Sequence, residues 1–512
     1  MAGKADKAGK AGKAGASVEP IGIGDIDGFD HECDVLVVGF GCAGAAAAYE
    51  AAEAGADVLV LERASGPGGS SAQSGGELYL GGGTEIQKAC GFDDTADNMY
   101  AYLEKALGPN ADTEKLRLYC DGSVEHFEWF KARGVPFEPS FFDKPTWMPF
   151  TNDGLMWLGE NSWPYNTVAD PVPRGHRPPA AGFGGNVMMD KLVASATEAG
   201  AITHGDTQAT NLVLDGDRRV VGVVARKYGE TVTYRARKAV VLTTGGFVDN
   251  EEMLADHAPL LLGHGKVSDG LDDGSGIRMA TAIGAATRRM SVVEIALTAV
   301  PAMVCRGMLV DGLGRRFLNE DVYPGHWSVH AVKHQPGPYW TIIDEEGYED
   351  IAEADRWGMR PAHVCETLAE LEESLGMPAG SLETTVETYN RHAEKGEDPY
   401  FHKDPKWLRP LKSPFAAVDP RAGFFNQGGT AQGTGASGFT LGGLHTTIDG
   451  EVLNNSGTPL PGLYAAGRAA SGMHGEGYIS GTSLGDGTFF GRRAGRAAAA
   501  LTATTAPATP AG

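Results

Sequence analysis

Three glycines and one acid stand at the spacing of a dinucleotide-binding loop. Gly39, Gly41 and Gly44 follow the apolar residues 35–38, and Glu62 ends the next apolar run. In such a loop the glycines allow a tight turn, a close approach of backbone to diphosphate, and close packing of the following helix. An acid in the place of Glu62 accepts hydrogen bonds from ribose hydroxyls and repels a 2′-phosphate. The pattern therefore predicts a dinucleotide site and disfavours NADP.

Two further glycine-rich elements distinguish between the dinucleotides. Residues 65–76 (SGPGGSSAQSGG) come almost directly after this acid and offer hydroxyl and N–H donors to a second part of a long ligand. Residues 461–467 (PGLYAAG) and 481–487 (GTSLGDG) precede the Ala-rich end of the chain. An NAD domain has no need of the first element, so together they favour FAD. Residues 63–76 contain no histidine that could form a covalent link to the flavin, and we therefore expect FAD to be held non-covalently.

The elements that must position these residues are those of a parallel sheet covered by helices. Residues 35–38, preceded by Asp34, and residues 58–61 are apolar runs rich in β-branched residues, and the Ala-rich segment 42–55 lies between them, which completes a βαβ unit. A further buried strand is expected at 239–244 and a helix at 491–501. The predicted fold class is α/β, with a Rossmann-like FAD-binding domain of discontinuous sequence and an inserted α+β cap domain that holds catalytic residues.

The domain organisation follows from changes in composition. Near residue 291 strands and charged helical segments, among them 362–375, replace the Gly-rich pattern, which returns near residue 425. The predicted parts are a disordered basic tail (1–29), the first part of the FAD-binding domain (30–290), the cap (291–425), the second part of the FAD-binding domain (426–502) and a tail (503–512).

Composition and charge exclude several functional classes. The formal net charge is -23, from 43 Lys and Arg against 66 Asp and Glu, which disfavours nucleic acid as a partner. The sequence has no run of 18 apolar residues, so no integral membrane segment is expected. None of the 6 cysteines forms a C-x-x-C pair, and no histidine spacing completes a metal site. We expect reduced thiols, no metal and a cytoplasmic location.

These segments resemble the fumarate reductase and ketosteroid dehydrogenase group of flavoproteins. The similarity covers about residues 30–500 and is carried by VVGFGCAGAAAAYEAAEAGADVLVLERASGPGGSSAQSGG, VLTTGGF, DGLGRRFLNE, FTLGGL, PGLYAAGR and GYISGTSLGDGTFFGRRAG. The resemblance implies that the cap closes over the isoalloxazine ring. It also implies dehydrogenation or reduction of a carbon–carbon bond next to a carbonyl.

On this resemblance, the residues expected to bind FAD come from every glycine-rich segment. They are Gly39, Gly41, Ala43, Gly44, Glu62, Arg63, Gly69, Ser70, Ser71, Ser74, Gly75, Gly76, Thr210, Gly245, Asp273, Gly467, Ser483 and Leu484. One departure concerns Arg468, since many members of the group have Glu or Asp after the Ala-Gly of the C-terminal strand.

Two positions set the chain apart from the fumarate reductases of the group. In those enzymes an Arg that acts as the acid of the reaction follows the Asn-Glu of R-F-x-N-E. A second Arg, in the late Gly-rich loop, binds a carboxylate of the substrate. Here residues 319–335 contain no Arg, and residues 469–491 contain neither Arg nor Lys. Burying two carboxylates without cations is costly. Tyr323 and the stretch GYISG at 477–481 stand there instead and resemble the 3-ketosteroid dehydrogenases, most of all the Δ4-(5α) type.

The expected reaction forms a C=C bond α,β to a ketone, most simply C4–C5 of a 5α-3-ketosteroid. Flavin N5 would accept the β-hydride. Tyr478 and a backbone N–H at Gly481 or Thr482 would bind the ketone and stabilise enolate charge. Tyr323 with Ser480 would remove the C4 proton. The roles of the two tyrosines are exchangeable on sequence grounds.

Three alternatives remain open at this point. The first is a Δ1-type ketosteroid dehydrogenase, and the second is a flavin-dependent reductase of an unsaturated acid such as fumarate or urocanate. The third is a flavin module for redox sensing or electron transfer, which would leave a cap of about 130 residues without a task. The electron acceptor is unknown.

Overall fold

The central sheet of the protein contains the predicted parallel strands. A computed structural model describes residues 18–422 and 435–504. Strands β2 (His31–Val38), β3 (Val58–Leu61) and β8 (Ile202–His204) run parallel to one another, and β11 (Glu230–Leu242) lies between β2 and the parallel β22 (Pro459–Ala465). One face packs on helices, with Val35 and Val37 buried among the alanines of residues 43–52, and the other face packs on the apolar side chains of residues 209–225, so both apolar runs, 35–38 and 58–61, are fully buried. The predicted α/β fold class is confirmed.

An antiparallel extension widens this sheet on one side. Strands β9 (Thr207–Leu214) and β10 (Val220–Lys227) pair antiparallel to each other, and β10 pairs with β11. The strand expected at 239–244 is the second half of a longer strand, since β11 already begins at Glu230 and continues through an irregularity after Ala236.

The predicted N-terminal tail needs a correction over its last part. Residues 1–17 lie outside the described residues, but β1 (Ile21–Gly22) pairs parallel with β9. Ile21, Ile23, Ile26 and Phe29 pack against Val213, Val221 and Val224 of the sheet. Residues 18–29 are therefore part of the folded domain, because alternate apolar side chains anchor them. At the other end of the chain Thr504 donates a backbone hydrogen bond to Arg237, and residues 505–512 lie outside the described residues.

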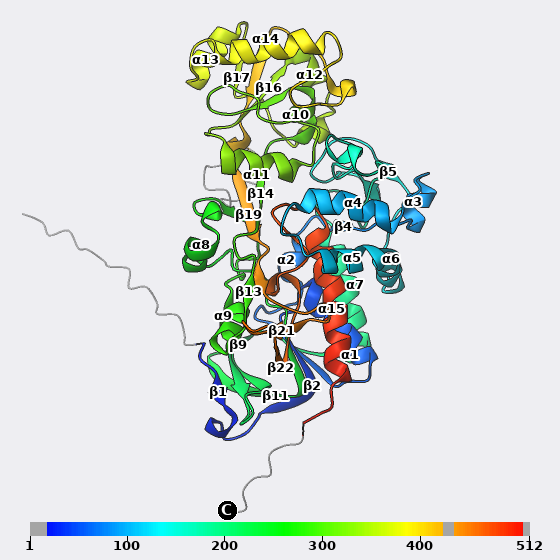
Figure 1. Ribbon diagram of the computed structural model, residues 1–512, viewed down its shortest axis with the longest axis vertical. Helices are drawn as coiled ribbons and strands as arrows, with labels where there is room; N and C mark the ends of the chain where they lie inside the picture. Colours follow the sequence, from blue (N-terminus) through cyan, green and yellow to red (C-terminus); the bar gives the residue numbers. More distant parts are fainter. Residues whose placement is uncertain (1–17, 423–434, 505–512) are drawn as a thin grey trace, which may run out of the picture.

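Two helices with small residues pack closely on one face of the sheet. Helix α1 (Cys42–Glu53) and helix α15 (Thr482–Ala500) lie side by side (Figure 1). A Cβ on Gly491 would lie 2.5 Å from the carbonyl oxygen of Ala43, and one on Gly495 would overlap the carbonyl of Ala47. Glycine at these positions allows the two backbones to touch.

A small second sheet and three helices lie above this pair. The strands, in sheet order, are β4 (Leu78–Tyr79), β7 (Gly175–His176), β6 (Leu155–Met156) and β5 (Phe141–Phe142). The helices are α4 (Ala96–Leu107), α5 (Thr113–Asp121) and α6 (Ser123–Ala132), and α7 (Gly185–Glu198) returns to the main sheet. Tyr79, Tyr102 and Phe127 are fully buried between them.

The upper part of Figure 1 is a separate α+β layer within residues 301–418. Its antiparallel sheet has the order β15 (Met308–Val310), β16 (Trp340–Asp344), β18 (Phe415–Val418) and β17 (His363–Cys365). Helices α13 (Leu368–Leu375) and α14 (Ser381–Ala393) cover one face through an apolar cluster that includes Leu371 and Val386. The single helix expected at 362–375 is therefore a strand followed by a helix.

Two long strands connect this layer to the rest of the molecule. Strand β14 (Val293–Leu297) pairs antiparallel with β19 (Ala436–Thr440) between the upper and lower parts of Figure 1. The predicted cap begins at residue 291, close to the start of β14. This boundary between the domains stays a prediction. The predicted end at 425 lies outside the described residues, in the gap at 423–434.

The other elements are short. The helices are α2 (Gly69–Ala72), α3 (Glu85–Ala89), α8 (Glu251–His257), α9 (Ser275–Ala282), α10 (Pro301–Arg306), α11 (Pro324–His334) and α12 (Glu345–Glu349). The strands are β12 (Gly265–Lys266), β13 (Thr287–Arg288), β20 (Gly443–Leu444) and β21 (Glu451–Leu453). The 3-10 turns are η1 (Ile23–Asp25), η2 (Tyr165–Thr167), η3 (Pro259–Leu261), η4 (Glu353–Arg356), η5 (Pro405–Trp407), η6 (Pro420–Ala422) and η8 (Gly467–Ala469).

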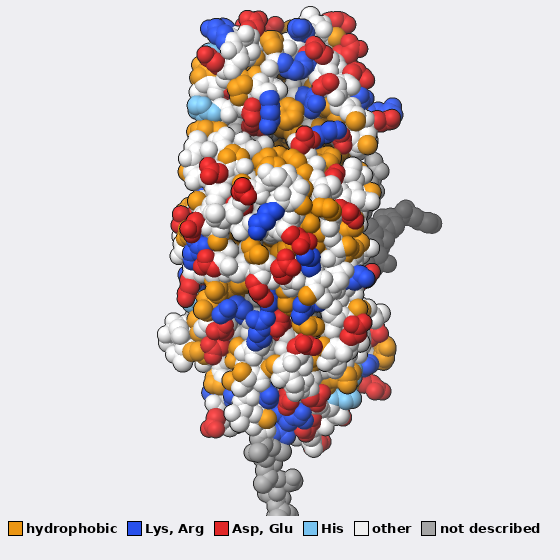
Figure 2. All heavy atoms as spheres, turned by 90° about the vertical axis from the view of Figure 1, so that its right-hand side faces the viewer, with side chains coloured by type: hydrophobic (Ala, Val, Ile, Leu, Met, Phe, Trp, Pro, Cys, Tyr) orange, Lys and Arg blue, Asp and Glu red, His pale blue; other side chains and the backbone are white. Residues whose placement is uncertain are grey.

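The surface carries mixed charge. On the face shown in Figure 2, acidic and basic side chains are interspersed from top to bottom, and no broad basic region is visible among the described residues there. No helix in the described ranges is long and apolar enough to cross a membrane.

Candidate functional site

One continuous cavity joins the glycine loop to the two tyrosines. Most residues predicted to bind a cofactor line it, namely Gly39, Gly41, Ala43, Glu62, Arg63, Gly69, Ser70, Ser71, Ser74, Gly75, Gly245, Gly467, Ser483 and Leu484. The predicted catalytic and substrate residues Tyr323, Tyr478, Ser480 and Gly481 line the same cavity. Segments from residue 38 to residue 484 are thus brought to one site.

Five predicted site residues do not line the cavity: Gly44, Gly76, Thr210, Asp273 and Thr482. A Cβ on Gly44 would overlap the carbonyl of Gly39, so its role is close packing. Gly76 has φ +80°, and a Cβ there would lie 2.6 Å from Gly184. Thr210 donates its hydroxyl to Val224, and the preceding residues 207–209 line the cavity in its place. Asp273 pairs with Arg63 at 2.5 Å, while Asp272 lines the wall.

The dinucleotide end is built by the turn between β2 and α1. Gly39 has φ +100°, and a Cβ there would lie 2.5 Å from the carbonyl oxygen of Thr243. Glu62 accepts the backbone N–H groups of Phe40 and Ala64, both at 2.8 Å, and burial raises the pKa of this carboxyl. Helix α1 begins after Gly41 without a side-chain cap. The N–H of Cys42 donates to Oγ of Ser71 at 3.2 Å, and those of Ala43 and Gly44 remain available to an anion in the cavity.

The middle of the cavity contains a buried ion pair and unpaired polar atoms. Arg468 contacts Asp272 at 2.5 Å, and its guanidinium lies over the ring of Phe439. Nη1 of Arg468 and the hydroxyls of Thr244 and Ser437 have no hydrogen-bond partner among the described residues. Buried donors of this kind require a partner from whatever fills the cavity. Together with the glycine loop, they fit a long ligand with a polar diphosphate-ribose part, as FAD has.

Tyr323 is fixed at the start of helix α11. Its hydroxyl donates to Oγ of Ser480 at 3.1 Å. A Cβ on Gly159 would lie 2.7 Å from the backbone nitrogen of Tyr323, so only glycine allows this approach. Trp147 packs edge-on against the Tyr323 ring, with the centroids 6.2 Å apart. The predicted pair of Tyr323 and Ser480 is thus formed across 157 residues of sequence.

Tyr478 lies in the loop before α15, between His474 and Phe439. The centroid of its ring is 5.6 Å from that of His474 and 5.4 Å from that of Phe439. The N–H of Thr482 donates to the carbonyl of Ile479 at 3.1 Å, so of the two predicted backbone donors only Gly481 remains available. Thr482 instead accepts a hydrogen bond from His474, because its own hydroxyl donates to Ile479.

Buried charges hold this loop on both sides. The ammonium of Lys115 donates to the carbonyl of Ser471 at 2.7 Å, and Asp486 accepts the N–H of Met473 at 2.9 Å. Burial raises the pKa of Asp486 to about 6. The start of the loop is therefore tied to α5 and to α15, the helix that follows the loop, which restricts the position of Tyr478.

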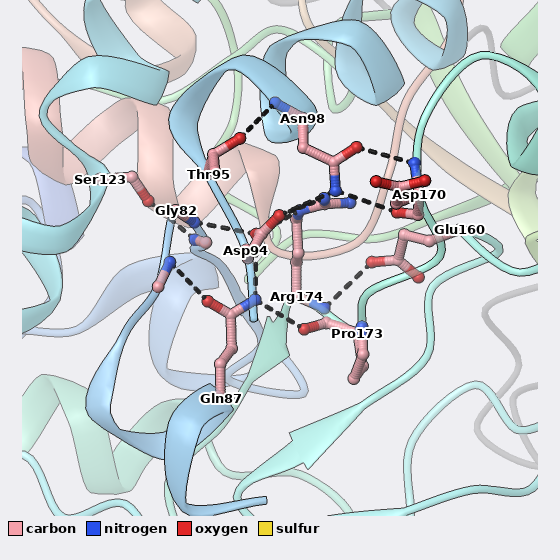
Figure 3. Close-up of polar contacts among 12 residues, drawn as sticks. Gly82, Gln87, Asp94, Thr95, Asn98, Ser123, Glu160, Asp170, Pro173 and Arg174 are labelled. Carbon is pink, nitrogen blue, oxygen red and sulfur yellow. Dashed lines mark hydrogen bonds and ion pairs between the residues drawn. The ribbon is translucent and has the colours of Figure 1, made fainter. Parts of the chain in front are cut away.

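A second polar cluster supports the site from behind (Figure 3). Arg174 makes a bidentate ion pair with Asp94, at 2.8 and 2.7 Å, and both side chains are fully buried. Asp94 also accepts hydrogen bonds from Gly82, Gln87 and Asn98. The N–H of Arg174 donates to Glu160, one residue after the Gly159 that touches Tyr323. This cluster positions the backbone at Gly159, which contacts Tyr323 at the end of the cavity that contains the two tyrosines.

Both tyrosines are uncharged in this environment. Burial raises the pKa of Tyr323 and of Tyr478 well above the ordinary value for a phenol. A phenol with a raised pKa donates a hydrogen bond and does not act as a standing base. The arrangement can therefore polarise a carbonyl and pass a proton along Tyr323 and Ser480.

Two buried acids in the cavity wall were missed by the sequence analysis. Glu294 is 3% and Glu77 is 6% exposed, and burial raises the pKa of both carboxyls. Each is a single acid beside an apolar run, SVVEIAL and GGELYL, and that isolation was the available signal. Within residues 18–422 and 435–504, no group of His, Cys, Asp or Glu could hold a metal ion.

Known proteins with a similar sequence and fold include FAD-binding enzymes. Residues 34–484 match the family described as FAD binding domain. A solved structure of the 3-ketosteroid-Δ4-(5α)-dehydrogenase from Rhodococcus jostii, in complex with 4-androstene-3,17-dione, is 46% identical with a TM-score of 0.89. The match covers 94% of this chain and 100% of that chain.

More distant relatives differ in activity. The 3-oxosteroid 1-dehydrogenase of Mycolicibacterium smegmatis is 26% identical over 90% of this chain and 96% of its own length. A probable fumarate reductase of Shewanella frigidimarina is 28% identical over 91% of this chain and 74% of its own length. The catalytic end of the cavity must therefore distinguish among these activities.

Proposed function

Because the chain belongs to the family of FAD-binding flavoproteins, we propose that it is a 3-ketosteroid dehydrogenase that forms the C4–C5 double bond of a 5α-3-ketosteroid. It is an FAD-dependent oxidoreductase that acts on CH–CH groups. The ketosteroid substrate rests on the relative with 46% identity and on the two tyrosines of the cavity.

The observation that carries the proposal is the composition of the wall around Tyr478. The only arginines that line the cavity within the described residues are Arg63 and Arg468, and each is paired with an aspartate. Uncharged phenols and a free N–H at Gly481 suit a ketone, whereas a dicarboxylate would be buried without counter-charges. This favours a ketosteroid over fumarate or urocanate.

FAD, when bound, supplies the acceptor for the hydride that leaves C5. The residues of the chain do the rest. Tyr478 and the N–H of Gly481 donate hydrogen bonds to the ketone oxygen, which stabilises negative charge as the C4 proton leaves. The Tyr323 hydroxyl takes that proton while passing its own to the partly exposed Ser480, whose hydroxyl proton passes to solvent, so that neither group is left with a charge.

Substitution of Tyr478 by Phe tests the assignment. We expect Tyr478→Phe to keep its FAD absorbance and to lose about 100-fold or more in turnover of a 5α-3-ketosteroid, because one donor to developing charge is removed. Tyr228→Phe is the control, since Tyr228 is 79% exposed and does not line the cavity. Unchanged turnover of Tyr478→Phe would remove the role.

Anaerobic bleaching of the bound flavin tests the substrate class. We expect bleaching by a 5α-3-ketosteroid and not by succinate. Bleaching by a 4-ene-3-ketosteroid would point instead to a Δ1-type enzyme, and reoxidation of the reduced enzyme by fumarate or urocanate would indicate an acid reductase. All six cysteines are free thiols, which supports a reducing compartment such as the cytoplasm.

A further inference from the structure

A buried carboxyl group in the reaction cavity has no partner. Both side-chain oxygens of Glu294 are buried and make no hydrogen bond to any described residue. A polar group buried without a partner costs free energy, and such groups are rare in folded proteins. The partner of Glu294 must therefore come from what the cavity binds.

The register of strand β14 directs this side chain into the cavity. Glu294 pairs with Phe439 of β19, and both line the cavity. Ala296 and Thr298 follow at two-residue intervals and line it as well, while Val293 and Ile295 pack into the core behind. Alternation along a strand fixes which face each side chain occupies. Glu294 is thus held in the cavity by ten paired residues of β14 and β19.

The neighbours of Glu294 are the catalytic tyrosines. A Cβ on Gly325 would overlap both Oε1 of Glu294 and the Tyr323 ring, so this glycine leaves room for the two side by side. The titratable groups that line the same end of the cavity are Glu77, Tyr323, Tyr478 and the paired Arg468. Since no cation pairs with Glu294, burial raises its pKa well above the ordinary value and keeps the group protonated.

We propose that Glu294, as an uncharged carboxylic acid, donates a hydrogen bond to the oxygen of the bound ketone beside Tyr478. This inference rests on the proposed function and names a third donor for the ketone. A buried carboxylic acid is more acidic than a phenol in its intrinsic chemistry, and so it is a strong donor to developing enolate charge.

The proton count is closed without a transfer from Glu294. As the C4–H bond breaks, its proton leaves through Tyr323 and Ser480 to solvent, and its electron pair moves toward the ketone oxygen. That pair would then form the C4=C5 bond when C5 loses its hydride, for which bound FAD would supply the acceptor. The O–H of Glu294 stabilises the intermediate charge and stays with the carboxyl group throughout.

Two substitutions separate a donor from a base. In the FAD-loaded enzyme, we expect Glu294→Leu to lower kcat for a 5α-3-ketosteroid about 100-fold, since a donor to developing charge is lost. Glu294→Gln keeps an N–H donor and should stay within about tenfold of the wild type. Glu252→Gln, an exposed acid on α8, is the control and should have no effect.

Infrared difference spectra give a readout that does not depend on turnover. With a 4-ene-3-ketosteroid carrying ¹³C at C3, we expect the ketone stretch to lie at higher frequency in Glu294→Leu than in the wild type. The C=O band of a protonated carboxyl group should respond to steroid in the wild type and be absent from both variants.

A failure of the donor role of Glu294 can be distinguished from a failure of the proposed function. Equal turnover and an equal ketone stretch in wild type and Glu294→Leu would overturn the donor role. So would a Glu294→Gln variant as slow as Glu294→Leu with an unshifted ketone stretch, which would make Glu294 a proton acceptor. A wild-type enzyme that no ketosteroid reduces would instead refute the proposed function, and this is measured before any variant.

Discussion

Two buried glutamates in this molecule have opposite surroundings. Glu160 is 1% and Glu294 is 3% exposed. Glu160 accepts the backbone N–H of Leu158 at 2.6 Å and that of Arg174 at 3.1 Å, in the cluster around the Asp94–Arg174 pair. Glu294 has no partner for either oxygen within the described residues.

The difference in hydrogen bonding indicates a structural role for Glu160 and a functional role for Glu294. A cluster tied together by an ion pair and many hydrogen bonds determines where the backbone goes, and these bonds inside the fold offset its cost of desolvation. A carboxyl group whose bonds are unmade raises the free energy of the ligand-free protein and lowers it again when a partner binds. Glu160 thus belongs to the framework behind Tyr323, and Glu294 to the chemistry in front of it.

The largest expected effect comes from breaking the ion pair of Asp94 and Arg174. Asp94→Ala leaves the buried guanidinium of Arg174 without its carboxylate and should lower the free energy of unfolding by about 3–5 kcal/mol. Denaturant unfolding of the FAD-loaded enzyme measures this. Asp97→Ala is the control, because Asp97 pairs with Arg117 while 93% exposed and should change stability by about 1 kcal/mol or less. Equal midpoints for the two variants would show that the cluster is not a structural support.

The second effect is a pH dependence of stability. Burial raises the pKa of Glu160 to about 7, above its value in an unfolded chain. Between about pH 5 and 7 the folded protein holds a proton that the unfolded chain releases, so stability falls as pH rises, by about 1.4 kcal/mol per unit at most. Glu160→Gln should flatten this slope, and Glu53→Gln, at the exposed end of α1, should keep it. An unaltered slope in Glu160→Gln would assign it to other acids.

The third effect tests the contact between Tyr323 and Glu294. Gly325→Ala should displace both side chains and cost about 1–3 kcal/mol of stability through overpacking. We expect steroid turnover to fall by more than the stability loss explains at a temperature where the variant is folded, with FAD content unchanged. Gly216→Ala is the control, since a Cβ there meets nothing within 4 Å. Normal turnover of Gly325→Ala would mean that this spacing does not matter.

The smallest effect has the opposite sign. Glu294→Leu removes a buried carboxyl group without a partner and should raise the free energy of unfolding of the steroid-free enzyme by about 1 kcal/mol. Glu372→Leu is the contrast, because Glu372 accepts three backbone N–H groups, from Gly380, Leu382 and Glu383. That variant should be destabilised. If both leucine variants lose stability, Glu294 has a partner in the fold after all.

Sequence reasoning reached the parts of the site that have a local pattern. The turn at Gly39, the acid Glu62 and the tyrosine loop are each encoded within a few residues. Thr210 and Asp273 were expected to contact the cofactor, but neighbouring residues line the cavity instead, because strand register and an ion pair with Arg63 decide which side chain faces inward. These details depend on tertiary contacts that spacing does not contain.

The missed residues and elements have a common cause. Glu294 lies in an apolar run that predicts a core strand. Its place in the cavity depends on contacts with Phe439 and Gly325, which are both distant in sequence. The strand at 363–365 was taken for helix because its partner β18 lies about 50 residues further along. Residues 18–29 were taken for tail because the sheet that receives them is formed by residues 207–227.

The seam of small residues between α1 and α15 has a consequence for the whole site. Helix α1 begins at the loop that receives the diphosphate, and α15 begins directly after Tyr478, Ser480 and Gly481. Since Gly491 and Gly495 rest on the backbone of Ala43 and Ala47, the two helix starts cannot move apart independently. The distance between the two ends of the cavity, at Gly41 and at Tyr478, therefore depends on the contacts of two glycines that do not line the cavity.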